Sequence, residues 1–234
     1  MEPTYLICLP FGGAGASFFK GWQEHVPEEL TILPIQLPGR EERFVETPHT
    51  DVARAVEEAY SWVLEQIDGS ARVALFGHSL GAVLAYELAH RLSDAEGIRL
   101  TRLFVSGSPS PWNGRKERAT GLGDDAFLAQ LHRFTGYTHP ALQDAMMRDL
   151  LLPMLRADVE MHENYRPSSD KPLSVPITAV RGRGDTLVDS AQISQWSEAT
   201  TAGLSTGELD GGHMYLADDH APLLRLIVTG MQTA

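Results

Sequence analysis

The pentapeptide Gly77-His78-Ser79-Leu80-Gly81 has the spacing of a nucleophilic serine. A serine hydroxyl is a weak nucleophile, so such a site also needs a general base and an acidic group that orients the base. The chain offers both downstream of Ser79, with Asp185 in a glycine-rich loop and His213 after two glycines. The order serine, aspartate, histidine is that of one class of strand-turn-helix serine enzymes. We therefore predict a catalytic triad in which His213 takes the proton of Ser79 and Asp185 holds the imidazole ring.

Other acids and histidines compete for the roles of Asp185 and His213. Asp189 follows Asp185 closely, but its position suits the cap of a helix. His78 is adjacent to Ser79, and on a tight turn its side chain is expected to point elsewhere. The remaining candidates fall in an exposed acidic stretch or in a separate helical region: His220, His132, His139 and His162.

Backbone N–H groups can stabilise the negative charge that develops when a serine attacks a carbonyl. Leu80 supplies one such donor at the start of a helix, and the loop after an early strand supplies the other. We expect the second donor to be Gly12, with Phe11 and Gly13 as alternatives. The same loop lacks both Gly-Lys-Ser/Thr and Gly-x-Gly-x-x-Gly, which argues against phosphate binding.

Short apolar runs alternate with helical patterns along most of the chain. The alternation predicts an α/β fold, with a mostly parallel sheet and helices on both of its faces. Strand 72–76 leads directly to Ser79 and helix 80–92 follows directly, which is typical of the nucleophile elbow of an α/β-hydrolase. The other strands are expected at 5–9, 31–35, 102–106, 175–180 and 204–209, and the other helices at 17–24, 51–67, 191–199 and 222–231.

Two helical patterns, 124–134 and 143–165, interrupt the alternation of strands and helices. We expect a single domain, 1–234, with a helical lid inserted at approximately 110–170; extra packing helices are the alternative. The second pattern has a broad apolar face, and Pro153 should kink it. Met146, Leu150 and Met154 on that face are candidates for an acyl pocket, although ordinary core packing explains them equally well.

Composition narrows the classes of protein and partner. The chain has 234 residues, enough for one sizeable core, and its net charge of −12 argues against nucleic acid as a partner. No apolar run approaches the roughly 20 residues of a membrane span, and the N-terminus does not resemble a signal peptide. The one cysteine, Cys8, is expected to be buried. We expect a cytoplasmic protein with no metal and no cofactor of its own.

The chain resembles type II thioesterases of polyketide and non-ribosomal peptide synthetase systems. The most distinctive stretch is Gln36-Leu37-Pro38-Gly39-Arg40-Glu41-Glu42-Arg43. The other matching segments are 8–19, 76–81, 182–185 and 211–213, so the resemblance extends over nearly the whole chain. Where the family usually has His-Ala-Gly-Gly, this chain has Phe11-Gly12-Gly13-Ala14, which removes a histidine but keeps a small residue at the expected oxyanion position.

The resemblance implies a serine thioesterase that hydrolyses acyl groups from the phosphopantetheine arm of acyl or peptidyl carrier proteins, in an editing role. It also implies a monomer that meets its partner transiently. Carrier proteins are generally acidic, so this acidic chain needs a local basic patch, for which Arg115, Lys116 and Arg118 are the candidates. An exposed loop without a partner explains these residues as well. Alternative functions are a product-releasing thioesterase, an acyltransferase, a general esterase of the same fold, or a non-catalytic binding module.

Overall fold

The computed structural model describes residues 2–114, 117–136 and 140–232. Within them, six strands form one sheet in the order β2-β1-β3-β4-β5-β6, and all neighbouring strands are parallel. The predicted parallel α/β sheet is therefore confirmed. The strands are Thr4–Leu9 (β1), Leu30–Pro34 (β2), Ala71–His78 (β3), Ile98–Ser106 (β4), Ile177–Gly182 (β5) and Leu204–Leu209 (β6).

Side chains along the central strands alternate between two hydrophobic layers, as the pleat of a strand requires. Ile7 and Leu75 belong to one layer, whereas Cys8 and Phe76 belong to the other. Burial of both faces explains why these strands appear as continuous apolar runs in the sequence. The first layer contains α1 (Val52–Gln66), α2 (Leu80–Leu92), α5 (Ser190–Ser194) and η4 (Gln195–Ala199), and the second contains η1 (Ala16–His25), α6 (Tyr215–Asp218) and α7 (Ala221–Gln232).

Side-chain caps define where two of these helices begin. Asp51 accepts a hydrogen bond from the N–H of Arg54 at the start of α1. Asp189 and Gln192 form a reciprocal capping box at the start of α5, which confirms the predicted capping role of Asp189. Asp189 is thereby accounted for without a role in catalysis.

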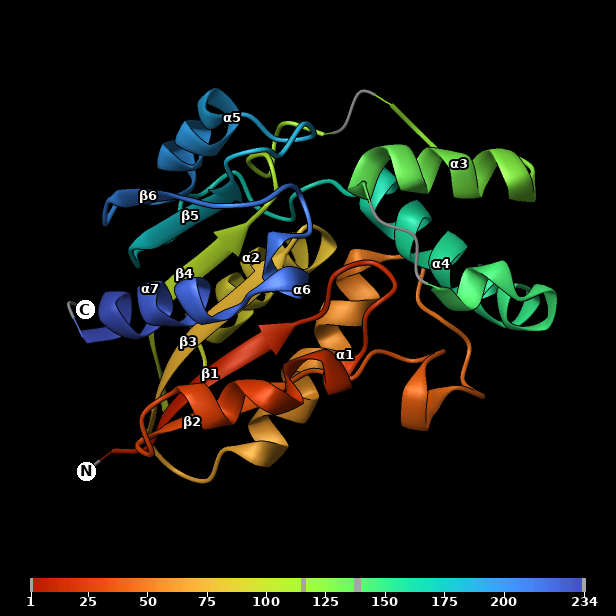
Figure 1. The fold of residues 1–234 in the computed structure, drawn as a ribbon. Helices are drawn as coiled ribbons and strands as arrows, with labels where there is room; N and C mark the ends of the chain where they lie inside the picture. The colour runs from red at the N-terminus through yellow and green to blue at the C-terminus, as the bar shows by residue number, and fades with distance from the viewer. Residues whose placement is uncertain (1, 115–116, 137–139, 233–234) are drawn as a thin grey trace.

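The insertion between β4 and β5 contains α3 (Asp124–Thr135), the short η3 (Pro140–Gln143) and α4 (Ala145–Asn164). We call residues 124–164 the lid segment. Figure 1 shows α3 and α4 beyond the carboxyl ends of the strands. Ser79 directly follows β3 at that end of the sheet. The two helices share a small core that includes Phe127, Phe134 and Leu152. A further short turn, η2 (Glu41–Arg43), lies between β2 and α1.

The alternative that ordinary core packing explains the apolar face of α4 is wrong for the first half of the helix. Met146 is 75 % exposed and Leu150 is 46 % exposed, whereas Met154 is buried. The buried positions fall mainly after Pro153, where α4 packs on the rest of the protein, and the first turns project outward (Figure 1). No helix in the described ranges is long and apolar enough to span a membrane.

Candidate active site

Ser79 occupies a strained turn between β3 and α2. Its φ of 53° and ψ of −115° are unfavourable for a residue with a side chain, and among the described non-glycine residues only Glu41 also has a positive φ. A Cβ at Gly77 would collide with the backbone of Gly81, and one at Gly81 would collide with the carbonyl of Leu9. The predicted strand-turn-helix elbow is therefore present, and the loop after β1 lies directly against it.

Asp185 and His213 are brought together by the loops that follow β5 and β6. Asp185 Oδ2 lies 2.8 Å from His213 Nδ1, and both side chains are buried. The other carboxylate oxygen, Oδ1, accepts hydrogen bonds from the N–H groups of Leu187 (2.8 Å) and Val188 (3.2 Å). Burial alone would raise the pKa of Asp185, but the hydrogen bond and charge of His213, with these two N–H groups, hold that pKa below its ordinary value.

The alignment of these two loops continues the parallel pairing of β5 with β6. Past the strand ends, the N–H of Arg183 donates to the carbonyl of Leu209 (2.7 Å) and that of Gly184 to Gly211 (2.8 Å). A Cβ at Gly182 would collide with the carbonyl of Gly212. Close backbone contact thus sets the position of His213 relative to Asp185.

The end of β4 connects this pair to the elbow. The N–H of Ser79 donates to the carbonyl of Ser106 (2.8 Å), and a Cβ at Gly107 would lie 2.5 Å from His78 Cε1 and 3.1 Å from His213 Cε1. The rings of His78 and His213 are 4.8 Å apart between centroids. His213 therefore lies beside the turn that carries Ser79.

A buried polar chain lies behind the two histidines. His78 Nδ1 is 2.9 Å from Ser106 Oγ, which is 2.7 Å from the hydroxyl of Tyr215. Burial raises the pKa of Tyr215, so its hydroxyl stays neutral. Sequence reasoning missed Ser106 and Tyr215; a serine at the end of a buried strand was the only available signal.

The backbone amides of the loop after β1 are not equivalent. The N–H of Gly13 donates to Asp158 Oδ2 (2.8 Å) and that of Ala14 to the carbonyl of Phe11 (3.0 Å). The N–H groups of Gly12 and Leu80 have no acceptor among the described residues. Gly13 is thus less suitable as an oxyanion donor. The backbone N–H groups of the preferred pair, Gly12 and Leu80, remain available to bind an oxyanion.

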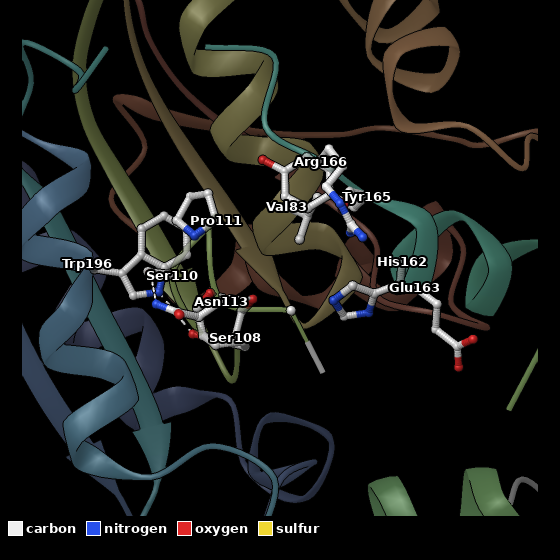
Figure 2. A pocket seen from close by; sticks show the side chains of 12 residues that line it. Val83, Ser108, Ser110, Pro111, Asn113, His162, Glu163, Tyr165, Arg166 and Trp196 are labelled. Carbon is white, nitrogen blue, oxygen red and sulfur yellow. Dashed lines mark hydrogen bonds between the residues drawn. The ribbon is translucent and has the colours of Figure 1, made fainter. Parts of the chain in front are cut away.

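A cavity opens beside the elbow, between the loop after β4 and the end of α4 (Figure 2). Val83 lines it, and this residue lies on α2 one helical turn after Ser79. Trp196 lines it and donates a hydrogen bond from its indole nitrogen to the carbonyl of Ser108 (2.9 Å). Met146, Leu150 and Met154 do not line this cavity, and neither does Ser79 itself. The other lining residues are Pro109, Ser110, Pro111, Asn113, Gly114, His162, Glu163, Tyr165 and Arg166.

The expected basic patch is only partly described. Arg115 and Lys116 lie outside the described residues. Arg118 is about half exposed, and its guanidinium contacts Glu163 (3.3 Å) and Asn164 (2.7 Å) at the end of α4. These contacts lie within the chain, so both interpretations of Arg118, as a carrier-protein contact and as a loop without a partner protein, stay open.

The competing histidines other than His78 lie away from the Asp185–His213 pair. His220 follows two exposed aspartates, as predicted, but its own half-buried ring stacks on Trp22 at 5.9 Å and contacts His25. His162 lines the cavity, and His132 lies on α3. His139 is outside the described residues. No cluster of three or more His, Cys, Asp or Glu side chains suited to a metal occurs in the described ranges.

Comparisons with known proteins agree with this geometry. Residues 4–229 match the family model described as thioesterase domain. The chain is 34 % identical to the gramicidin S biosynthesis protein GrsT of Aneurinibacillus migulanus over 225 residues, which is 95 % of this chain and 86 % of GrsT.

Two solved structures are similar in both sequence and fold. The RedJ thioesterase of the prodiginine pathway in Streptomyces coelicolor is 32 % identical, with a TM-score of 0.88 over 98 % of this chain and 86 % of RedJ. BorB, a type II thioesterase of the borrelidin cluster, is also 32 % identical, with a TM-score of 0.87 over 97 % of this chain and 92 % of BorB. The resemblance to type II thioesterases is confirmed, and the chain belongs to the thioesterase domain family.

Proposed function

We propose that this protein is a serine thioesterase that removes acyl groups from the phosphopantetheine arm of acyl or peptidyl carrier proteins, with an editing role in polyketide or non-ribosomal peptide biosynthesis. The observation that carries the proposal is the buried hydrogen bond of 2.8 Å between Asp185 and His213, beside the strained turn of Ser79. The names of the relatives support the proposal, because GrsT is a gramicidin S biosynthesis protein and BorB is a type II thioesterase of the borrelidin biosynthetic cluster.

The proposed reaction uses the triad in two steps. Asp185 holds Nδ1 of His213, which leaves Nε2 to accept the proton of Ser79 as its oxygen attacks the thioester carbonyl. The N–H groups of Gly12 and Leu80 bind the resulting oxyanion. The C–S bond then breaks, and the phosphopantetheine thiolate leaves with the proton from His213. Water, activated by His213, attacks the acyl-serine and releases the carboxylic acid.

The cavity beside α2 is proposed as the acyl site, in place of the exposed Met146 and Leu150. Its walls combine apolar groups, such as Val83 and Trp196, with polar ones, such as Asn113 and His162 (Figure 2). Replacing Val83 with phenylalanine would narrow it next to the nucleophile. We expect the Val83→Phe variant to lose more kcat/KM on long acyl chains than on acetyl, and equal losses on all chains would argue against this acyl site.

Recognition of the carrier protein is proposed to use the basic stretch at Arg115, Lys116 and Arg118. The net charge of −12 should otherwise slow the encounter with another acidic protein. Arg118 already contacts Glu163, so it has less positive charge to offer than a free guanidinium. The cytoplasmic location, the monomeric state and the absence of a cofactor remain predictions.

Turnover of a panel of acyl-carrier proteins, from acetyl to long chains, tests the proposed function. We expect a higher kcat/KM for acyl-carrier protein than for a soluble aryl ester with the same acyl group. Equal or better turnover of the free ester would favour a general esterase instead. Labelling by a fluorophosphonate should depend on Ser79 and vanish in Ser79→Ala, whereas failure of the wild type to label would favour a non-catalytic binding module.

A further inference from the structure

One buried ion pair connects the lid segment to the stretch that follows β2. Arg40 is 4 % exposed and Asp158 is 1 % exposed. They form a bidentate ion pair in which Nη1 donates to Oδ2 (2.8 Å) and Nη2 donates to Oδ1 (2.7 Å). Asp158 lies on α4, whereas Arg40 belongs to the Gln36–Arg43 stretch after β2. A two-point pair of this kind fixes orientation as well as distance.

Both partners of the pair also bond the backbone of the glycine-rich loop. Asp158 Oδ2 accepts the N–H of Gly13 at 2.8 Å, and Arg40 Nη1 donates to the carbonyl of Ala14 at 2.9 Å. Gly13 has a φ of +85°, and a Cβ there would lie 2.9 Å from the side chain of Leu155 on α4. The loop is thus pressed against α4 in a conformation that glycine adopts readily.

Two neighbours of Arg40 in the chain accept hydrogen bonds from the first residues of η1, which follows this loop directly. Gln36 Oε1 accepts the N–H of Ala16 at 2.8 Å, and the carboxylate of Glu41 accepts the N–H of Ser17 at 3.1 Å. Glu41 does so from a positive φ of 49°, the strained region that only Ser79 shares among the described non-glycine residues. Strain of this kind persists only where the surrounding structure enforces it, and it concentrates at functional sites.

We propose that Arg40 and Asp158 are positioning residues that orient the oxyanion donor Gly12. The N–H of Gly13 and the carbonyl of Ala14 are fixed by the ion pair, which sets the peptide planes immediately after Gly12. The N–H of Gly12 then has no acceptor in the described structure, so no protein group competes with the oxyanion for this hydrogen bond. Because Asp158 belongs to α4, the oxyanion site is complete only when the lid helix is seated. This inference rests on the proposed function.

The test separates loss of oxyanion stabilisation in the transition state from loss of folding stability. The Asp158→Ala variant removes the acceptor of Gly13, and we expect kcat on an acyl-pantetheine thioester to fall about 10- to 100-fold, with KM changed less than about threefold. A trifluoromethyl ketone analogue, which forms an oxyanion on attack by serine, should bind the variant weaker by the same factor. Arg40→Lys should show a smaller loss, because lysine keeps the charge but not the two-point geometry.

A double variant shows whether the two side chains act as a unit. Arg40→Ala combined with Asp158→Ala should lose little more kcat than Asp158→Ala alone, since each single change already breaks the pair.

The matched control is Glu87→Gln, which also alters a buried carboxylate that secures the chain after α4. Glu87, on α2, accepts the hydroxyl of Tyr165 (2.6 Å) and the N–H of Ser168 (3.1 Å), with no contact to the glycine-rich loop. We expect a lower melting temperature for this variant, with kcat and ketone affinity unchanged.

Three results separate the outcomes. If Asp158→Ala and Arg40→Lys lose melting temperature but keep kcat and ketone affinity, as Glu87→Gln does, the pair only holds the fold and the inference is overturned. If Asp158→Ala does not fold, Arg40→Lys decides by the same two readouts. If the wild type neither hydrolyses the thioester nor binds the ketone, the proposed function itself fails, and the inference with it.

Discussion

The two sides of the candidate site are held in place by different means. On the triad side, close backbone contacts between adjacent strand ends position Asp185 and His213, which lie 28 residues apart. On the oxyanion side, an ion pair between residues 118 positions apart anchors the glycine-rich loop to α4. The proposed triad is therefore positioned by the sheet, whereas the proposed oxyanion loop is anchored to the lid segment.

This difference matters because the two kinds of support fail differently. Backbone contacts between paired strands change little unless the sheet itself unfolds. A buried ion pair is strong while both partners are present, but removing one partner leaves an uncompensated buried charge. We expect substitutions in the sheet to disturb the geometry of the proposed triad and the stability together. Substitutions in the lid segment should instead lower kcat by displacing the proposed oxyanion loop.

The largest expected effect is on the triad side. His213→Ala removes the base, so kcat should fall by roughly 10³-fold or more, and the melting temperature should fall as well because the buried Asp185 loses its partner. Thioester turnover and a thermal melt check this. A loss of less than about tenfold would mean that another group serves as the base, with His78 the nearest candidate.

Backbone contact on the triad side can be tested with two glycines. Gly182→Ala would force a Cβ against the carbonyl of Gly212 and push the loops of Asp185 and His213 apart, so we expect kcat to fall about 10- to 100-fold, with lower stability. Gly212→Ala is the matched control, since a Cβ there meets no atom within 4 Å. Similar losses in both variants would show that contact between these loops is not what aligns the pair.

The two halves of α4 should differ in stability. Met154→Ala removes a buried side chain next to the anchored half and should lower the free energy of unfolding by about 2–4 kcal/mol. Met146→Ala changes a residue that is mostly in solvent and should stay within about 0.5 kcal/mol. Denaturant titrations measure both. Equal effects would mean that the first half of α4 is covered in solution.

The smallest expected effect concerns acid pH. The pKa of Asp185 is lowered in the folded state, so its ionised form stabilises the native protein above the ordinary value of 3.8, and this contribution is lost as the pH falls through the lowered pKa. The difference in melting temperature between wild type and Asp185→Asn should therefore shrink as the pH is lowered from about 5 to well below 3.8. A difference that grows on acidification would contradict the lowered pKa.

Much of the fold was accessible from local patterns. Alternating runs predicted the parallel sheet, although β4 begins at Ile98 rather than 102, because its first residues are less apolar and gain strand structure by pairing with β3. The short α6 had no helical signal of its own and was not predicted. The pattern of α4 left open whether its apolar face forms a pocket or packs in the core, because periodicity shows which residues share a face but not what covers that face.

Local patterns were enough to predict the elbow and the candidate triad, since glycine spacing and the order of strand ends constrain the backbone directly. The side chains that support them became visible only in the folded protein. Arg40 stood in a distinctive stretch, but nothing near it in the chain indicated Asp158, Gly13 or Ala14 as its partners. Pairing over such a separation depends on how α4 packs on the loop after β1, and that packing arises only when the whole chain has folded.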